Sequence, residues 1–237
     1  MVECIRAQTC RDYHLVIVDD MSTDDTWSVI KSLKPDKAIQ LKHKGYAGGA
    51  RNAGMQVFKE DAYTLWLDDD DVLIGNDVFG RIKRNAEENG FPDIIRLNYI
   101  KTTLSTGLPG KHHDRYPDPI TPKDVCKDIA RGMPWTKAVR TEKCVDFPDD
   151  LLVDDCYQHI MQCDVCETAS AVHEDCYEWL VREGSCTTTR KGVMWESGWY
   201  LEIAKLMRQK EHYIHDWARE AADLRIAWIK RTMLRGG

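Results

Sequence analysis

Two short apolar segments in the first half of the chain each run directly into a cluster of carboxylates. Residues 13–18 are followed by two aspartates, and residues 62–67 are followed by four, at 68–71. Like charges this close repel one another and resist leaving water, so a folded chain keeps such a cluster only where solvent or a cation neutralises it. The fold must therefore bury the apolar segments and still bring their acidic ends to water or to a ligand.

The spacing of the apolar segments predicts alternating strands and helices. Strands are expected at 13–18, 38–42 and 62–67, the last of them as a buried central strand of the sheet. Helices are expected at 2–7, 22–33, 76–89 and after the glycine-rich stretch 45–54. Such alternation is typical of βαβ units and a mostly parallel sheet. Ser22, with Asp25 three residues later, is interpreted as a capping box that opens the second helix. Ligands bind at the carboxyl ends of strands in open α/β sheets, which is where the aspartates stand.

The second half of the chain has a different pattern. A strand is expected at 93–100, a loop-rich stretch at 102–119, and helices from Pro122, at 154–163 and at 196–235. Thr121 followed by Pro122 fits an N-cap and a first helical position. The apolar positions of the last helical stretch form a stripe that is expected to pack on its own domain. They are Trp199, Ile203, Leu206, Tyr213, Trp217, Leu224, Trp228 and Ile229.

Composition narrows the class of protein. With 237 residues, of which 43% are hydrophobic, the chain can bury a full core as one domain with appendages. A net charge of -6 argues against a protein that binds nucleic acid or anionic lipid over its whole surface. No apolar run is long enough to span a bilayer, and the first residues do not resemble a signal peptide. We therefore expect a soluble, cytoplasmic protein without a membrane span.

The cysteines leave one question open. Nine of them are scattered through segments expected to be helical or extended, which favours reduced thiols over a disulfide scaffold. One cluster includes a C-x-x-C spacing and is a candidate zinc site, formed by Cys156, His159, Cys163, Cys166, His173 and Cys176. Several of these residues would share one helix, and cysteine is also a common buried apolar residue. Buried thiols are therefore the favoured interpretation.

Six segments, in order along the chain, resemble the motifs of the family 2 glycosyltransferases with the GT-A fold. They are 18–26 (V-D-D-G-S-x-D-x-T), 50–54 (A-R-N-x-G), 68–71 (D-x-D-D), 135–137 (W-x-K), 154–155 (E-D) and 182–185 (R-x-G-S-like). Met21 stands at the usual glycine of the first motif, and Asp154 at the usual glutamate of the fifth. The match spans residues 2–189 and leaves the last helical stretch unassigned.

The resemblance implies an α/β fold of the GT-A, Rossmann-like type, with a mixed, mostly parallel sheet flanked by helices. Residues 1–190 would form the glycosyltransferase domain, with a nucleotide-sugar-binding half at 1–100 and an acceptor and catalytic half at 101–190. Residues 191–237 would form a C-terminal helical extension. The family's first strand, S-I-I-I-P-V-Y-N, has no counterpart here. Either the true start of the protein lies upstream, or the strand that would neighbour this one lacks a hydrogen-bonding partner and the side chains that would bury it.

By the same resemblance, the chain is expected to move a sugar from a nucleotide diphosphate sugar to an acceptor hydroxyl, with inversion and with a metal ion. The donor is expected to be a UDP-sugar and the acceptor a carbohydrate or another hydroxyl compound. Asp19 and Asp20 are candidates for hydrogen bonds to the base or the ribose. Arg51 is a candidate for holding either a nearby carboxylate or the diphosphate, and a purely structural salt bridge is the alternative.

The second acidic run supplies the candidate metal site. Alternate residues of an extended segment point the same way, so Asp68 and Asp70 could reach one cation together. Carboxylate oxygens select Mg²⁺ or Mn²⁺, and such an ion neutralises charge that grows on the diphosphate as the sugar leaves. Asp68 and Asp69 are also candidate donor contacts. Asp155, or Asp154 beside it, is the candidate general base.

Several residues carry two interpretations each. Asp71 is either a first-turn acid or a contact of the donor sugar. Trp135 is either a platform on which an acceptor sugar stacks or part of the core. His112 and His113 are either diphosphate contacts or surface histidines, with the surface interpretation favoured.

Two other functions stay open at this point. Basic residues in the stretch 196–235 would suit a glycosyltransferase that modifies hydroxylated bases in DNA, but acids interspersed among them dilute that charge. The missing first strand would suit a truncated, non-catalytic GT-A binding module, and the retained acids argue against that reading. DNA is therefore a partner that the sequence permits without favouring.

Overall fold

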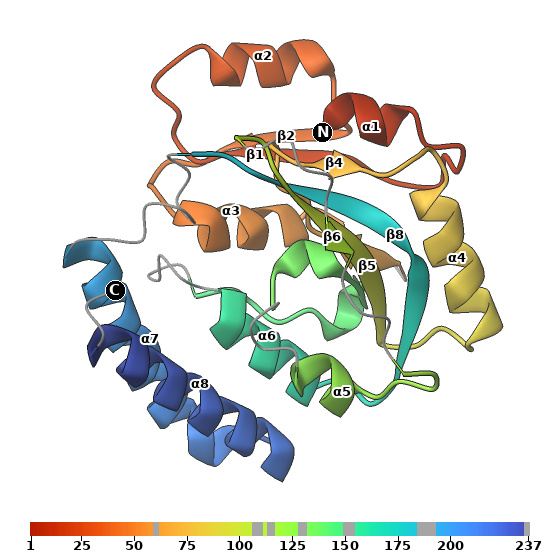
Figure 1. Cartoon of the computed structure of the whole chain (residues 1–237). Coiled ribbons are helices and arrows are strands. Elements are labelled where there is room, and N and C mark those ends of the chain that lie inside the picture. Colours follow the sequence, from red (N-terminus) through yellow and green to blue (C-terminus); the bar gives the residue numbers. More distant parts are fainter. Residues whose placement is uncertain are drawn as a thin grey trace.

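The computed structural model describes residues 1–58, 62–105, 111–112, 117–127, 132–148, 155–183 and 193–234 (Figure 1). The first part of the chain alternates between helices and strands, as expected. The glycine-rich stretch 45–54, expected to be a turn that leads into a helix, itself forms the helix Tyr46–Met55, so that detail of the prediction is wrong. Its elements are α1 (Val2–Arg6), β1 (Val16–Asp19), α2 (Thr26–Leu33), β2 (Lys37–Gln40), α3 (Tyr46–Met55), β3 (Tyr63–Leu65), β4 (Val72–Leu73) and α4 (Val78–Glu88).

The second part contains the longest strands and the longest helices. Its elements are β5 (Ile94–Thr103), β6 (Lys111–His112), α5 (Pro122–Lys127), β7 (Lys137–Arg140), α6 (Asp155–Asp164), β8 (Ala169–Val181), α7 (Val193–Gln209) and α8 (Asp216–Leu234), with short 3₁₀ turns at η2 (Pro134–Thr136), η3 (Thr141–Lys143) and η4 (Lys210–His212). The sequence pattern did not predict β8, although it is the central partner of β5.

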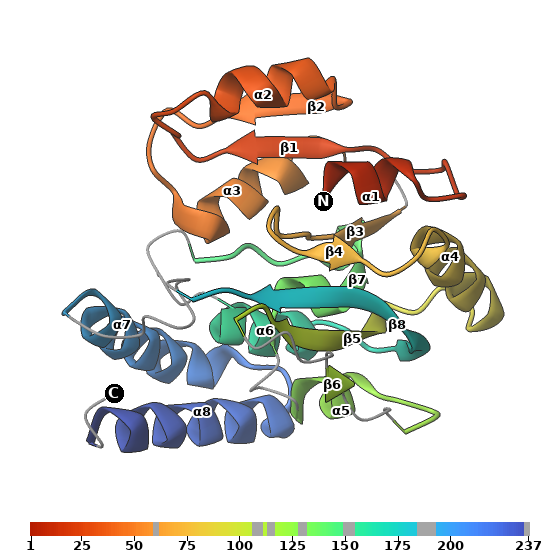
Figure 2. The ribbon, with the colours of Figure 1, turned by 45° about the horizontal axis from the view of Figure 1, so that its top comes forward.

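The strands form two separate sheets. β1 and β2 pair in parallel, and the other strands form a larger sheet in the order β3-β7-β5-β8-β4, with β6 added to β5. In the larger sheet β5 and β8 run parallel and the other pairs run antiparallel. The larger sheet is mixed, as expected, but fewer of its strand pairs are parallel than the sequence pattern predicts. Figure 2 shows β1 and β2 beyond β3 and β4, on the side away from β5 and β8.

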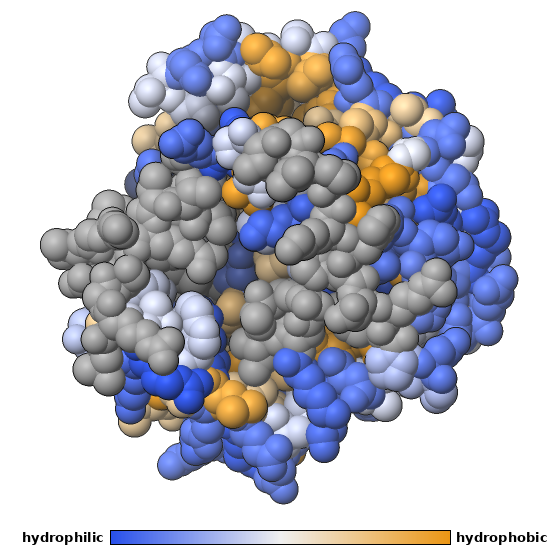
Figure 3. Space-filling view, viewed as in Figure 1, coloured by the Kyte–Doolittle hydropathy of each residue, from blue (hydrophilic) through white to orange (hydrophobic). Residues whose placement is uncertain are grey.

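This division leaves β1 and β3 at sheet edges. In the described chain β1 is hydrogen-bonded to β2 alone, and β3 to β7 alone. Val16, Ile17 and Val18 are therefore half-buried, whereas the first six residues of β5 are buried. Figure 3 shows apolar surface over the end of α2 that lies nearest to α1 in Figure 1. The central position expected for strand 62–67 is wrong, because within the described residues its outer edge has no ladder partner.

Two apolar clusters hold the large sheet between the helices. One cluster joins Ile95 and Tyr177 of the sheet to Val78 of α4. The other joins Ile94 of the sheet to helices α5, α6 and α8, and includes Leu206 of α7. Figure 1 accordingly shows α4 on one flank of β5 and β8, with α5, α6, α7 and α8 on the other. The helices expected at 191–237 therefore share a core with the preceding residues.

The C-terminal helical stretch is broken and only partly buried. A 3₁₀ turn and a short connection separate α7 from α8, where the sequence indicated one continuous helical region. Trp199, Leu206 and Ile229 are buried as expected. Leu224 is 64% exposed and Trp228 39% exposed, so the prediction that these two pack on the domain is wrong. No described helix combines the length and the apolar character needed to cross a bilayer.

The capping expected at the start of α2 is also wrong, whereas that of α5 is confirmed. α2 begins at Thr26, and Asp25 makes no side-chain cap. Met21 has a φ of 59°, in the left-handed region that glycine adopts without cost. The chain therefore turns at Met21, and Ser22 lies in this turn, four residues before the helix begins. At α5, the Thr121 hydroxyl accepts a hydrogen bond from the N–H of Asp124 at 3.3 Å.

Candidate active site

The four aspartates at 68–71 lie in a turn between β3 and β4 and occupy different environments. Asp68 is half-buried, Asp69 and Asp70 are exposed, and Asp71 is buried with 3% of its surface exposed. The extended backbone expected here is wrong, because Asp69 and Asp70 form the turn. The acids therefore reach separate partners instead of alternating between two sides.

Two arginines from distant segments pair with acids of this run. Arg51 Nη2 lies 3.1 Å from Asp68 Oδ1, and Arg182 Nη2 lies 2.5 Å from Asp70 Oδ2. Burial raises the pKa of Asp68, and the positive charge of Arg51 opposes that rise. Cations of the chain itself thus neutralise part of the charge concentrated at 68–71.

Asp71 faces the interior and is held by β8. Tyr177 Oη donates to Asp71 Oδ2 at 2.7 Å, and the N–H of Leu180 donates to Oδ1 at 2.9 Å. Burial raises the pKa of Asp71 to about 6 and the pKa of Tyr177 well above its ordinary value. Both carboxylate oxygens are engaged inside the fold, so Asp71 ties the acidic turn to the sheet.

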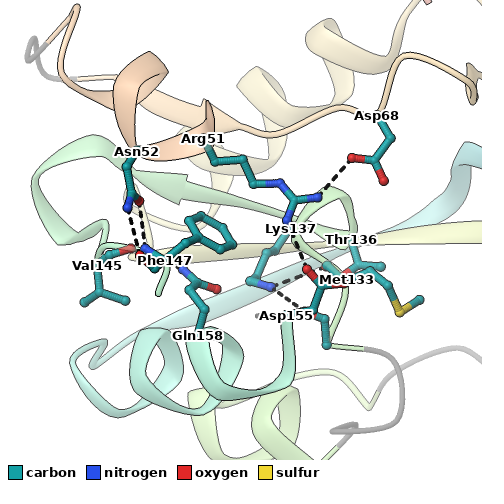
Figure 4. Close-up of polar contacts among 11 residues, drawn as sticks. Arg51, Asn52, Asp68, Met133, Thr136, Lys137, Val145, Phe147, Asp155 and Gln158 are labelled. Carbon is teal, nitrogen blue, oxygen red and sulfur yellow. Dashed lines mark hydrogen bonds and ion pairs between the residues drawn. The ribbon is translucent and has the colours of Figure 1, made fainter. Parts of the chain in front are cut away.

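One guanidinium joins the acidic turn to the candidate base. Arg51, in α3, also places Nη1 3.0 Å from Oδ1 of Asp155, the first residue of α6 (Figure 4). The guanidinium lies 5.2 Å from the ring centre of Phe147. Two carboxylates from opposite halves of the chain are thus paired with one guanidinium, and Arg51 contacts carboxylates as one of its interpretations predicts. Asp154, the other candidate base, lies outside the described residues.

Asn52, next to Arg51, fixes the segment that follows η3. Its Nδ2 donates to the carbonyl of Phe147 at 2.8 Å, and its Oδ1 accepts the N–H of the same residue at 2.7 Å (Figure 4). From α6, Gln158 Nε2 donates to the carbonyl of Val145 at 3.4 Å. The segment is therefore clamped between α3 and α6, the two helices that carry Arg51 and Asp155.

The first acidic run is held by neutral donors. Asp19 is 2% exposed; its Oδ1 accepts the N–H of Ser22 at 3.1 Å and its Oδ2 accepts Nε2 of Gln40 at 2.9 Å. Burial raises the pKa of Asp19, but the hydrogen bonds from Ser22 and Gln40 more than offset this, so the pKa lies below its ordinary value. Asp20 Oδ1 accepts the N–H of Gly45 at 2.7 Å. Both acids thus stand at the carboxyl end of β1, as predicted.

Trp135 belongs to the core. It is 2% exposed, stacks on Tyr177 with ring centres 4.3 Å apart and planes 9° apart, and meets the edge of Tyr99 at 4.9 Å. Of its two interpretations, the acceptor platform is wrong and the core residue is confirmed. His113 lies outside the described residues, and only the backbone of His112 is described, as part of β6.

A buried cation lies beside Asp155. Lys137, the first residue of β7, is fully buried, and its Nζ donates to the carbonyls of Gly132 at 3.3 Å and Met133 at 3.4 Å (Figure 4). Burial lowers the pKa of Lys137 to about 8, although the negative charge of Asp155 acts in the opposite direction. Buried charge is therefore concentrated around the second acidic run and its partners.

The chemistry of Asp68 and Asp70 fits a hard divalent cation. Mg²⁺ is usually bound by one or two carboxylates together with waters and substrate phosphates. Among the described residues, no three aspartate, glutamate, histidine or cysteine side chains converge as a metal site. This part of the chain can therefore offer two carboxylate ligands, and a diphosphate and water would have to complete the coordination.

The residues considered for zinc are separated by the fold. Cys163 and Cys166 pack in the cluster that includes α8, whereas Cys176 packs in the cluster that includes α4. Burial raises the pKa of Cys166 to about 12 and the pKa of Cys176 to about 11. These thiols keep their protons and act as buried apolar groups.

Sequence reasoning assigned no role to three residues that build the site. Tyr177 lies on β8, which was not predicted, and stands 106 positions from its partner Asp71. Asn52 lies inside the A-R-N-x-G segment, so the motif contained the signal although its role was not assigned. Arg182 was likewise part of a quoted segment, and its contact with Asp70 gives it a role that spacing alone could not.

Comparisons with known proteins point to one family. A family model described as Glycosyl transferase family 2 matches residues 1–139. UDP-Glc:alpha-D-GlcNAc-diphosphoundecaprenol beta-1,3-glucosyltransferase WfaP of Escherichia coli is 37% identical over 110 residues, 45% of this chain and 43% of that protein. Glycosyltransferase GlyG of Streptococcus pneumoniae serotype 4 is 28% identical over 114 residues, 45% of this chain and 37% of that protein. The matched part spans less than half of either relative.

Solved structures extend the likeness over nearly the whole chain. S. aureus TarS 1-349 in complex with UDP-GlcNAc matches with a TM-score of 0.76 and 18% identity, over 97% of this chain and 66% of that chain. Mannosyltransferase PcManGT from Pyrobaculum calidifontis, in complex with GDP-Man and Mn²⁺, matches with a TM-score of 0.56 and 17% identity, over 97% of this chain and 70% of that chain. At these identities the likeness concerns the fold.

Proposed function

The chain belongs to glycosyl transferase family 2 and has the GT-A fold, and from this premise we propose that it is a metal-dependent, inverting glycosyltransferase. Its donor is a UDP-sugar and its acceptor is a hydroxyl of a carbohydrate or a carbohydrate-bearing molecule. The name of the E. coli relative and the UDP and UDP-GlcNAc complexes of TarS support the uridine nucleotide. The GDP-Man and Mn²⁺ complex of PcManGT supports a nucleotide diphosphate sugar with a divalent ion.

The observation that carries this proposal is the double ion pair of Arg51. Asp68, a candidate metal ligand, and Asp155, the candidate base, lie 3.1 Å and 3.0 Å from the two terminal nitrogens of one guanidinium. Inverting transfer needs a carboxylate at the donor diphosphate and a second one at the acceptor hydroxyl, both close to the same anomeric carbon. Arg51 provides that spacing from a single side chain.

On the donor side, Asp19 and Asp20 bind the base and ribose, and Asp68 and Asp69 contact the rest of the donor. Asp68 and Asp70 hold Mg²⁺ or Mn²⁺, which when bound neutralises the charge that develops on the departing diphosphate. The location of both acidic runs at the carboxyl ends of β1 and β3 supports this arrangement.

On the acceptor side, Asp155 takes the proton of the acceptor hydroxyl. The hydroxyl oxygen then forms a bond to the anomeric carbon as the bond from that carbon to the diphosphate breaks, on the opposite face, so the configuration inverts. Asp154 remains the alternative base in this proposal. The nucleotide half (1–100), the acceptor half (101–190) and the C-terminal helices (191–237) keep their proposed boundaries, with Arg51 and Asn52 linking the first two.

Calorimetry with UDP tests the donor site. The whole chain is titrated with UDP in Mn²⁺ and again in EDTA, and release of UDP from UDP-sugars is then measured with carbohydrate acceptors. Tighter binding in Mn²⁺ together with acceptor-dependent UDP release is the expected result. A folded sample that does not bind UDP in Mn²⁺ would favour the non-catalytic binding module instead.

The structure gives the DNA-modifying alternative no added support. Basic side chains of the C-terminal helices pair with acids of the same helices: Lys210 lies 2.6 Å from Asp223, and Arg225 forms a buried pair with Glu202 at 2.8 Å. Charges neutralised in this way contribute little to a phosphate-binding face.

A further inference from the structure

The hydroxyl of Tyr177 joins the two ends of the acidic turn. It donates to Oδ2 of Asp71 at 2.7 Å and accepts the backbone N–H of Asp68 at 3.3 Å. The first and the last of the four aspartates are therefore held at a common oxygen atom. Asp69 and Asp70, which lie between them, are exposed and form the tip of the turn.

The position of that hydroxyl is set by rigid packing. Tyr177 is 1% exposed and lies in β8, where it is the register partner of Leu73 in β4. Its ring stacks on Trp135, which is itself buried. A tyrosine fixed by a strand on one side and an indole on the other can hold the turn in one place, because its ring has no room to rotate.

The backbone of β8 makes a second attachment. Asp71 Oδ1 accepts the N–H of Leu180 at 2.9 Å, so both oxygens of this carboxylate are committed to the strand. The turn is therefore anchored to β8 at both of its ends, and Asp70 at its tip pairs with Arg182, just beyond that strand. A phenylalanine would fill the same space without the hydroxyl, so packing alone does not explain a tyrosine at this position.

We propose that Tyr177 is a positioning residue that sets the arrangement of Asp68 and Asp70 for the divalent cation. This role rests on the proposed function, because it assumes that the turn binds a metal with the donor diphosphate. Tyr177 touches neither the donor nor the ion. It acts through the backbone of Asp68 and the carboxylate of Asp71.

The test is Tyr177→Phe, with Tyr63→Phe as the matched control. Tyr63 Oη donates to the carbonyl of Pro92, also at 2.7 Å, at the opposite end of β3 from the acidic turn. Each substitution removes a hydroxyl that donates one hydrogen bond of 2.7 Å. Tyr177→Phe also removes the bond that this oxygen accepts from the N–H of Asp68, so it is expected to cost more thermal stability than Tyr63→Phe.

The readout is the ratio of UDP affinity in Mn²⁺ to UDP affinity in EDTA, measured by calorimetry on wild type and both variants. We expect Tyr177→Phe to reduce this ratio about tenfold and Tyr63→Phe to leave it unchanged. A general loss of structure would weaken binding in both media and would not change the ratio. Thermal unfolding of each variant, followed by circular dichroism, establishes that the sample is folded.

Each outcome decides a different point. A wild-type ratio in folded Tyr177→Phe would overturn the positioning role and leave the proposed function intact. A wild type that gains nothing from Mn²⁺ would overturn the metal-dependent function and the role of Tyr177 with it. If Tyr177→Phe does not fold while Tyr63→Phe does, the hydroxyl serves global stability and the positioning role is rejected.

Discussion

The runs at 19–20 and at 68–71 both follow a short apolar strand, and different kinds of partner hold them. Asp19 and Asp20 accept hydrogen bonds from backbone N–H groups and an amide, at most 25 positions away. The run at 68–71 is held by Arg51, Tyr177 and Arg182, the last of them 112 positions from its aspartate. The same sequence pattern is thus held by residues nearby in the chain at 19–20 and by residues from distant parts of the chain at 68–71.

The difference shows in the pKa values. Hydrogen bonds lower the pKa of Asp19 despite its burial, whereas burial raises the pKa of Asp68 and Asp71. A carboxylate satisfied by fixed neutral donors is stable by itself and can present a fixed surface to a nucleotide. Asp68 and Asp70 are held by Arg51 and Arg182 and depend on those cations, which suits a place where another cation must bind. Asp71 accepts hydrogen bonds from neutral donors and ties the turn to the sheet.

The largest effect on turnover is expected at Asp155, the candidate base, which pairs with the same arginine as Asp68 of the second run. Asp155→Asn should lower turnover about 1,000-fold, because the amide cannot accept the acceptor proton. UDP affinity in Mn²⁺ should stay within about threefold of wild type, which is measured by calorimetry beside the turnover assay. The control is Asp216→Asn, an acid at the same first position of α8. Wild-type turnover by Asp155→Asn would remove Asp155 as the base.

The second prediction concerns the buried cation beside that base. The pKa of Lys137 is about 8 in the folded chain and 10.5 in the unfolded one, so the unfolded chain binds more protons between these values. Stability should therefore rise with pH across this window, by about 3 kcal/mol in total. Urea unfolding at pH 8 and pH 10 should show about 2 kcal/mol of this rise, and Lys137→Met should remove it.

Lys83→Met is the control for that measurement, because Lys83 is an exposed lysine paired with Asp12 on the surface. Its pH dependence should follow that of the wild-type chain. An equally steep rise in Lys137→Met would mean that other groups produce it.

A smaller effect is expected at the tip of the second run. Asp70→Asn should reduce UDP affinity about 30-fold in Mn²⁺ and leave it unchanged in EDTA, because an amide is a much weaker ligand for a hard cation. Asp12→Asn, which alters an exposed acid elsewhere, should change neither value. Unchanged affinity of Asp70→Asn in Mn²⁺ would reject Asp70 as a metal ligand.

The smallest effect is expected in the first run. Asp19→Asn should weaken UDP binding about threefold, equally in Mn²⁺ and in EDTA, because an asparagine offers one acceptor oxygen where Ser22 and Gln40 need two. Asp24→Asn is the control, since Asp24 also accepts a local backbone N–H, that of Thr26. A loss confined to Mn²⁺ would show that the two runs do not differ as described here.

The contrast also explains how far the sequence could predict the site. The positions of both runs followed from apolar segments that end in acids, and the contacts of Asp19 are local enough to follow from the same stretch. The pairing of Arg51 with Asp155 spans 104 positions and depends on how α3 and α6 pack. Spacing along the chain contains no information on that packing, and the family motifs supplied the two residues without their contact.

The fold was predictable in a similar measure. Helices and strands of the first part were expected because their apolar periods are regular and their ends carry glycine, proline or acids. β8 was missed because its pattern mixes buried and half-buried positions with charged residues, and its length became clear only from its pairing with β5. The edge position of β3 was missed because a short apolar segment is the same in sequence whether it has one ladder partner or two.

The half-covered β1 also bears on how the purified chain will behave. An apolar strand whose outer edge has no ladder partner in the described chain is a template on which another extended segment can add. This edge lies on the side of β1 that faces β3 and β4 (Figure 2), so a second molecule cannot reach it with its own β1. A separate extended segment is what would pair there, and it would cover the half-exposed valines and the isoleucine of β1.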